Sequence, residues 1–191
     1  MQRGFKSQCE QISKRYRKEL GLTLDEALPY RTFADHLKVR IWTPEQVPDL
    51  EQSFVDLLTN ESASYWSAVT VQSDGKTRII VNSSHSEKRL ANDVTHELAH
   101  LILDHKKARL EISDDGLLWL KSYRKEQEEE ADWLAAALLL PREGLMSVYR
   151  KTTDIVNLSN IFEVSTDLVN MRINRTGITK QLSYSKKGVS L

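Results

Sequence analysis

The apolar residues in the N-terminal part of the chain recur first at helical and then at extended spacing. Apolar positions three and four residues apart predict an amphipathic helix from Phe5 to about Leu20, which Gly21 ends. Similar patterns predict short helices within residues 28–37 and 50–58. Between these, Val39–Trp42 has the β-branched and aromatic content of a strand. This part of the chain therefore combines helices with a strand.

The middle of the chain predicts a β-hairpin followed by a long helix. Two extended segments, Tyr65–Val71 and Thr77–Val81, are separated by a turn that contains the Asp74-Gly75 pair. Polar residues after the second segment offer caps for a helix from about Ser86 to Asp104, with a core-facing stripe of Leu90, Val94, Leu98 and Leu101. A small antiparallel sheet packed on helices is therefore expected.

The C-terminal part of the chain is predicted to be helical. A helix from about Lys121 to Leu140 is acidic in its first half and apolar in its second, and Pro141 ends it. Two shorter helical patterns around Glu163-Val164-Ser165 are typical of a helix-turn-helix, and a loop is expected at 113–116. We therefore expect an α+β protein with a main domain at 1–150, a helix-turn-helix-like segment at 151–180 and a polar tail at 181–191.

Composition limits the classes of protein to which the chain can belong. Its 191 residues, 40% of them hydrophobic, suit one globular domain with at most a small appendage. Lys plus Arg and Asp plus Glu each number 27, so no overall charge excess attracts nucleic acid or an anionic membrane. The N-terminus lacks the apolar core of a secretory signal and the longest apolar run is too short to span a bilayer, so a cytoplasmic location is expected.

The segment His96-Glu97-Leu98-Ala99-His100 lies in the middle of the first long predicted helix. Residues four apart lie on one face of a helix, so the two imidazoles can bind one metal ion, and Glu97 can reach a water molecule at that ion. Because Cys9 is the only cysteine, such an ion would need nitrogen and oxygen ligands. The same five residues also fit a surface helix without a metal, so the surrounding sequence has to decide.

The second long predicted helix offers a third ligand. Catalytic zinc commonly takes three protein ligands, and with two histidines the third is often a glutamate from a separate helix. The acidic candidates are Glu126, Glu128, Glu129 and Glu130. Acidic residues early in a helix also favour its dipole and need no metal. Glu130 lies where the helix changes from solvated to apolar, so we expect its carboxylate on the core side, where an unpaired charge is costly.

Three segments, WSAVTVQSDGKTRIIVN, VTHELAHLILDH and EEEADWLAAALLLP, together resemble the ImmA/IrrE family of small zinc metallopeptidases. The resemblance covers about residues 30–141 and implies a zincin-like metallopeptidase core. It places one Zn²⁺ per chain on His96, His100 and Glu130 and makes Glu97 the catalytic base. It also implies a protein or peptide substrate, such as a transcriptional repressor encoded nearby. Asp132 and Asp104 are candidates to orient the two histidines.

A DNA-binding or regulatory protein with a structural or vestigial zinc site is the alternative function. Arg172, Arg175 and Lys180 could meet phosphates, but acidic residues dilute their field: Asp154, Glu163 and Asp167. The presence of Glu97 favours the enzyme, because a structural zinc site needs no carboxylate beside its first histidine. One strand of the predicted hairpin could bind a peptide substrate at its edge, and either strand fits this role.

Overall fold

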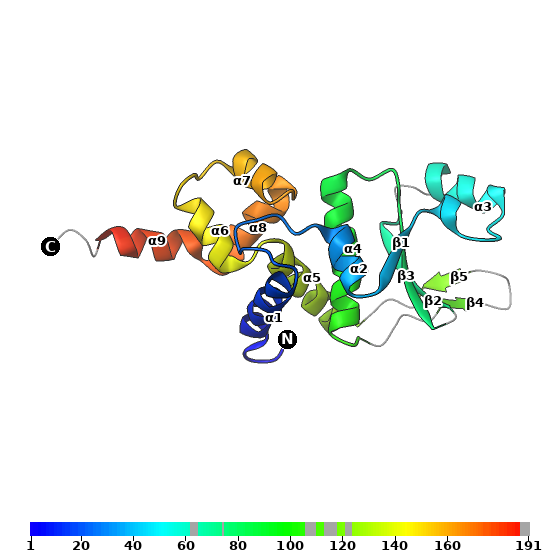
Figure 1. Ribbon diagram of the computed structural model, residues 1–191, viewed down its shortest axis with the longest axis horizontal. Helices are drawn as coiled ribbons and strands as arrows, with labels where there is room; N and C mark the ends of the chain where they lie inside the picture. Colours follow the sequence, from blue (N-terminus) through cyan, green and yellow to red (C-terminus); the bar gives the residue numbers. More distant parts are fainter. Residues whose placement is uncertain (62–64, 74, 106–109, 113–117, 121–123, 188–191) are drawn as a thin grey trace.

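The computed structural model contains residues 1–191 and describes all of them except 62–64, 74, 106–109, 113–117, 121–123 and 188–191 (Figure 1). Its helices are α1 Phe5–Glu19, α2 Tyr30–His36, α3 Gln52–Asp56, α4 Glu87–Ile102, α5 Lys125–Leu139, α6 Arg142–Tyr149, α7 Ile155–Ile161, α8 Thr166–Thr176 and α9 Ile178–Lys187. A π-helical turn, Leu57–Glu61, follows α3. The two long helices and the helix pair near the C-terminus are thus confirmed, and the loop predicted at 113–116 lies outside the described residues.

The main sheet has three strands in the order β1-β3-β2, formed by β1 Val39–Trp42, β3 Lys76–Val81 and β2 Ala68–Ser73. β2 and β3 pair antiparallel as the predicted hairpin. β1 pairs parallel with β3, so the sheet is mixed and the expectation of an antiparallel sheet is correct for only one of its two pairings. Parallel neighbours need a long connection, which here contains α3 and β2 itself.

Several elements were not predicted from the sequence. A second hairpin, between α4 and α5, pairs β4 Leu110–Ile112 with β5 Leu118–Leu120. Pro141 ends α5 as expected, but it also begins the short helix α6. The expected polar tail is helical as far as Lys187, because α9 continues the chain directly after Gly177, which has a φ of 67°.

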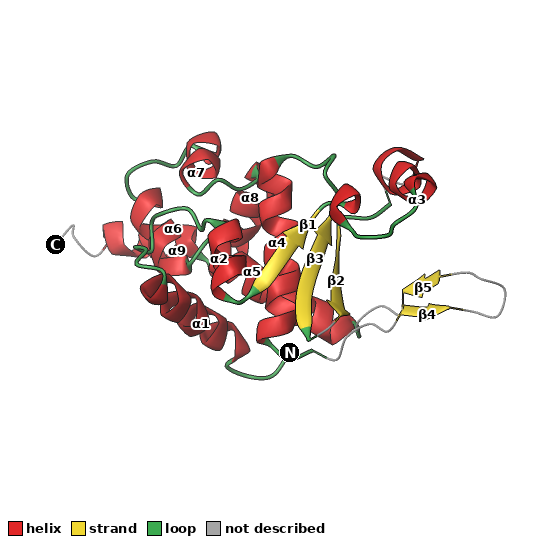
Figure 2. Ribbon diagram, turned by 45° about the vertical axis from the view of Figure 1, so that its right-hand side comes forward, coloured by secondary structure: helices red, strands yellow, loops and turns green. Residues whose placement is uncertain are grey.

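α4 and α5 pack against each other at the centre of the molecule. The sheet lies on one side of this pair and the helices α6 to α9 lie on the other (Figures 1 and 2). Ala131 and Ala135 of α5 are buried, and their small side chains allow the two helices to approach closely. From Trp133 to Leu140 every side chain is buried, so this half of α5 is enclosed by protein on all sides.

The C-terminal end of α5 is stabilised by polar side chains from other helices. The last carbonyls of a helix have no partner within it, and Pro141 cannot continue the helix. Ser13 of α1 donates to the Ala137 carbonyl at 2.7 Å, and Arg17 donates to the Leu138 and Leu139 carbonyls at 3.0 and 3.3 Å. These contacts attach α1 to the end of α5.

α7 and α8 form the expected helix-turn-helix-like unit. Asp154 caps α7 and Ser165 caps α8 through their side chains, and Glu163 in the turn has a φ of 55°. Arg172 of α8 is 1% exposed, donates to the Leu140 carbonyl at 2.9 Å and pairs with Glu10 of α1 at 2.6 Å. The unit is therefore fixed to the end of α5, and Arg172 does not meet phosphates as the sequence suggested it could.

Candidate metal centre

α4 brings the two histidines of the HELAH segment together. Helical spacing places His96 and His100 one turn apart, and their Nε2 atoms lie 3.0 Å from each other. The His100 side chain is 1% exposed and that of His96 is 22% exposed. One imidazole is therefore enclosed by protein while the other reaches the surface.

Glu128 of α5 completes the group. Its Oε2 atom lies 3.2 Å from His96 Nε2 and 3.7 Å from His100 Nε2. A zinc ion with tetrahedral bonds of about 2.0–2.1 Å holds its ligand atoms about 3.3 Å apart. The three observed separations of 3.0, 3.2 and 3.7 Å bracket that value, and two nitrogens with one carboxylate oxygen are donors that zinc accepts. The residues present therefore fit a zinc ion.

Glu130, which the sequence suggested as the third ligand, lies elsewhere. Its Oε2 atom is 3.4 Å from His105 Nε2, and it is not part of the group formed by His96, His100 and Glu128. Two residues along a helix correspond to a rotation of about 200°, so Glu128 and Glu130 cannot direct their carboxylates to the same point. Glu130 does face the protein interior, as expected, but there it meets a histidine beyond the end of α4.

Each candidate metal-binding histidine has a partner at its other ring nitrogen. His96 Nδ1 lies 3.0 Å from Asp132 Oδ1, and His100 Nδ1 lies 2.9 Å from His105 Nδ1. Asp132 therefore lies where one of the two suggested orienting carboxylates was expected, whereas for His100 the partner is His105 rather than Asp104. Such partners fix the orientation and tautomer of a ligand imidazole. Through His105, Glu130 belongs to the surroundings of the site.

Burial sets the protonation of the site. Burial and the neighbouring His96 and His105 lower the pKa of His100 to about 3, so its imidazole is neutral and has a lone pair to offer. For His96, burial acts to lower the pKa, but the hydrogen bond and charge of Asp132 outweigh it and the pKa is raised. The hydrogen bond with His96 holds the pKa of Asp132 below its usual value. Asp132 is therefore the anionic partner in this pair.

Glu97 has a separate position from the metal-binding group. Thr70 of β2 donates a short hydrogen bond to Glu97 Oε2, which connects the sheet to the site. Burial raises the pKa of Glu97 and so makes its carboxylate a better proton acceptor. His96 and Glu97 line a pocket of about 310 Å³ together with Ala68, the first residue of β2, and Ser67 just before it. β2 is an edge strand, and within the described residues no further strand pairs with its outer side.

Comparison with known families decides the assignment. The sequence model of the IrrE N-terminal-like domain of the M78 peptidases matches residues 55–174, from α3 to α8. The chain belongs to this family. The match includes both helices of the metal centre, so the resemblance found in the sequence is confirmed. Membership of the M78 family also indicates a metallopeptidase and a metal that is typically zinc.

A solved structure shares the fold of this M78 family member. A Mycobacterium tuberculosis transcriptional regulator is similar with a TM-score of 0.53 and 14% identity, over 87% of this chain and 46% of that one. The chain thus spans about half the length of the regulator, and at this identity the likeness shows the fold alone. The chain has no match among curated proteins. None of the helices in the described part of the chain has the length and apolar character needed to span a bilayer.

Two residues around this candidate site, His105 and Thr70, were not predicted from the sequence, and Glu128 was only one of four acidic candidates. Glu128 and Asp132 are four residues apart on α5, the same spacing as His96 and His100 on α4, and that matched spacing could have favoured Glu128 over Glu130. His105 lies beyond the end of α4, outside the helical spacing of the HELAH segment, yet its side chain is 7% exposed and contacts His100. Thr70 reaches Glu97 only through the packing of β2 on α4, which no local pattern shows.

Proposed function

We propose that the protein is a zinc-dependent endopeptidase in which His96, His100 and Glu128 hold the metal and Glu97 is the general base. The observation that carries this proposal is the convergence of two imidazole nitrogens and one carboxylate oxygen within 4.8 Å, beside a second carboxylate outside that group. Three ligands leave room for water and substrate, as a catalytic site requires. Glu97 gives this arrangement the proton acceptor that a purely structural site does not need.

The side chains of the site have distinct tasks in peptide hydrolysis. When bound, zinc supplies a Lewis acid that activates water and polarises a carbonyl group. Glu97 accepts a proton from the attacking water at a carboxylate oxygen and then donates it to the leaving amine. Thr70 holds that carboxylate in place, while Asp132 and His105 orient the two imidazoles. The outer edge of β2 offers backbone groups that can pair with an extended substrate.

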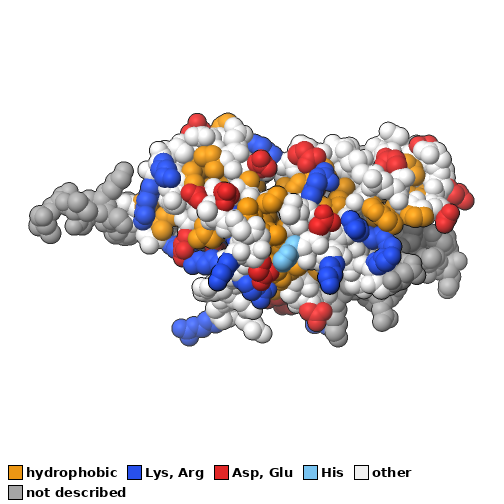
Figure 3. Space-filling view, viewed as in Figure 1, with side chains coloured by type: hydrophobic (Ala, Val, Ile, Leu, Met, Phe, Trp, Pro, Cys, Tyr) orange, Lys and Arg blue, Asp and Glu red, His pale blue; other side chains and the backbone are white. Residues whose placement is uncertain are grey.

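The substrate of this site is proposed to be a partner protein, such as a transcriptional repressor encoded nearby. The alternative, DNA binding by α7 and α8, has less support because Arg172 is buried and the Arg175 guanidinium lies over the Trp133 ring, 5.7 Å from its centroid. On the face shown in Figure 3, lysine and arginine side chains alternate with acidic ones instead of forming one large basic area. Such a surface does not favour a polyanion.

Co-expression with the repressor from the neighbouring reading frame tests the proposed function. Wild type should cleave that repressor, and Glu97→Gln should slow cleavage by about 10²- to 10⁴-fold because general-base catalysis is lost. Glu97→Gln should retain its zinc, measured by elemental analysis. A chelator should abolish cleavage by wild type, and added zinc should restore it.

Three results would count against the proposal. If the purified protein binds no zinc when zinc is supplied, the proposed mechanism is excluded. Cleavage that Glu97→Gln performs at the wild-type rate would exclude Glu97 as the base. An intact repressor in the presence of zinc-loaded wild type would move support to the regulatory alternative.

A further inference from the structure

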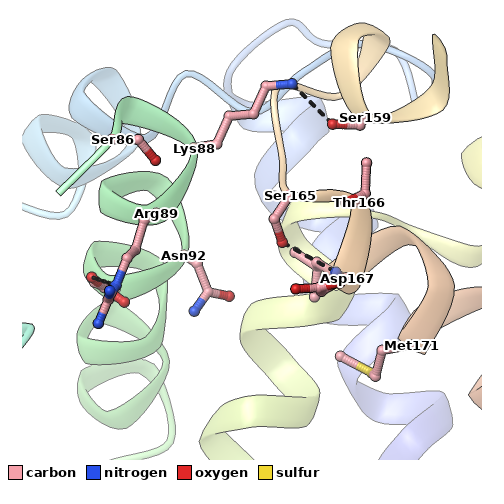
Figure 4. A pocket seen from close by; sticks show the side chains of 11 residues that line it. Ser86, Lys88, Arg89, Asn92, Ser159, Ser165, Thr166, Asp167 and Met171 are labelled. Carbon is pink, nitrogen blue, oxygen red and sulfur yellow. Dashed lines mark hydrogen bonds and ion pairs between the residues drawn. The ribbon is translucent and has the colours of Figure 1, made fainter. Parts of the chain in front are cut away.

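A cleft lies between α4 and the α7–α8 unit. It has a volume of about 710 Å³, and its lining includes Lys88, Arg89, Asn92, Asp167, Leu168 and Met171. Figure 4 shows the α4 side chains on one wall and those of Ser165, Asp167 and Met171 on the other, with open space between them. The metal centre makes no use of this cleft.

The cleft shares part of its lining with the pocket at the candidate metal centre. Asn92 and Asp93 line both hollows, and they lie one helical turn before His96 and Glu97 on α4. Arg89, one turn earlier still, donates to Ser67 at 3.3 Å, and Ser67 lines the pocket at the metal centre. From His96 to Lys88 the helix rises about 12 Å, a distance that three to four residues of extended peptide cover.

The far wall of the cleft is firmly attached to the peptidase core. Lys88 Nζ donates to Ser159 Oγ at 2.9 Å and to Asn160 Oδ1 at 2.8 Å, which joins α4 to α7 across one end of the cleft (Figure 4). The buried contacts of Arg172 fix α8 to α5 and α1. Both walls therefore have defined positions, and a substrate would meet a preformed surface.

The chemistry of the lining favours an apolar side chain. Two cations, Lys88 and Arg89, are balanced by two anions, Asp93 and Asp167, so the lining carries no net charge. Leu168 and Met171 contribute the apolar part of the surface, and methionine adapts to side chains of different shape. Hydroxyl and amide groups at the rim, from Asn92 and Thr166, suit the backbone of an extended peptide.

From these observations we infer that the cleft binds an apolar side chain of the substrate, three to four residues from the bond that is cleaved. This inference rests on the proposed function, since it extends the same substrate along α4. The helix-turn-helix-like unit then helps to select the peptide substrate. The family match extends through this unit to residue 174, which agrees with a function that the unit and the peptidase core perform together.

Binding without cleavage tests the inference. Zinc-loaded Glu97→Gln is incubated with a pool of short random peptides, and the retained peptides are identified by mass spectrometry. We expect enrichment of leucine, methionine and phenylalanine at one position. In the Glu97→Gln background, Met171→Asp should reduce peptide retention by about tenfold or more, because a charge replaces an apolar contact. Met171→Leu in the same background should retain peptides as well as Glu97→Gln alone. Val156→Asp is the matched control, since Val156 is 60% exposed on α7 and does not line the cleft.

A second variant covers the case in which Met171→Asp does not fold. Thr166→Trp places a large side chain at the exposed rim and should also reduce retention. Peptides retained equally by Glu97→Gln and by both cleft variants, or no retained peptide at all, would overturn the inference. A change of oligomeric state in Met171→Asp with unchanged retention would instead identify the cleft as a contact between copies. Cleavage by wild type is measured separately, so failure of the proposed function is distinguished from failure of the cleft.

Discussion

The two ends of α5 differ in chemistry and in what they contribute. The N-terminal half carries Glu128 and Asp132, which are partly exposed and contact the histidines of α4. The C-terminal end is enclosed, and its carbonyls accept hydrogen bonds from Ser13, Arg17 and Arg172. Negative side chains near the start of a helix and positive ones near its end both favour the helix dipole. One helix thus contributes to the candidate metal centre at one end and joins α1 and α8 at the other.

The N-terminal end of α5 therefore serves the proposed function, whereas its C-terminal end stabilises the fold. Substituting the carboxylates at the exposed end should change the free energy of unfolding little, because water solvates the groups that lose their partner. Removing a guanidinium group at the enclosed end leaves buried carbonyls without their hydrogen-bond donors, and removing Arg172 also takes the positive charge away from Glu10. Substitutions at the two ends should therefore change different measured quantities.

Removing the proposed third ligand should have the largest effect. Glu128→Ala should reduce the bound metal from about one zinc per chain to almost none, because two histidines alone bind weakly. Glu130→Ala should keep its zinc, since Glu130 contacts His105. Elemental analysis after dialysis measures both. If zinc were lost only from Glu130→Ala, Glu130 would be the third ligand, as the sequence suggested.

Removing Arg172 should mainly affect stability. Arg172→Ala removes the donor to the Leu140 carbonyl and the charged partner of Glu10, which keeps its hydrogen bond from the Arg142 backbone N–H. Loss of one member of a buried pair costs up to about 3–5 kcal/mol. Urea unfolding of the zinc-free protein measures this loss. Arg175→Ala is the control, because its exposed cation–π contact contributes only about 1 kcal/mol. Equal unfolding midpoints for the two variants would contradict the proposed role of Arg172 in stabilising the enclosed end of α5.

The same contrast shows which parts of the molecule the sequence could predict. α1, α4, β1 and the β2–β3 hairpin follow from local apolar spacing and turn residues. His96, Glu97 and His100 were found because all three lie on one helix. The choice among the glutamates of α5 depends on how that helix is rotated against α4, which is set by packing between distant segments.

Arg172 illustrates the same limit. As a basic residue in a helix-turn-helix pattern it suggested phosphate contacts, but its partners are Leu140 and Glu10, 32 and 162 residues away in the sequence. Side chains that stabilise the end of another helix have no spacing rule, so tertiary structure is needed to recognise them. Arg17 is a second example, because it lies on α1 but donates to the Leu138 carbonyl of α5.

Weakening the orientation of His96 should have a smaller effect than removing a ligand. Asp132→Asn keeps the size of the side chain but loses the charge that accepts from His96 Nδ1, and zinc affinity should fall by about 10- to 100-fold. Competition with a fluorescent chelator measures the affinity. Glu126→Gln, an exposed change in the first turn of α5, is the control and should leave it unchanged. Equal affinities for the two variants would mean that Asp132 does not orient the histidine.

The smallest predicted effect concerns the pH dependence of stability at Cys9 of α1. Cys9 is fully buried, and burial raises its pKa from 9.0 to about 12. Above pH 9 the thiol ionises in the unfolded state but not in the folded state, so folding stability should fall as pH rises from 9 towards 12. The slope attributable to this thiol is at most about 1.4 kcal/mol per pH unit.

Comparison with Cys9→Ala isolates this contribution. The variant has a lower stability at neutral pH because a small cavity replaces the sulfur, but it should lose less further stability between pH 9 and 10.5 than wild type does. Urea unfolding at each pH measures the two slopes. Parallel slopes would show that the thiol remains accessible to ionisation in the folded protein. In that case the packing of α1 on α5 is looser than its buried hydrogen bonds indicate.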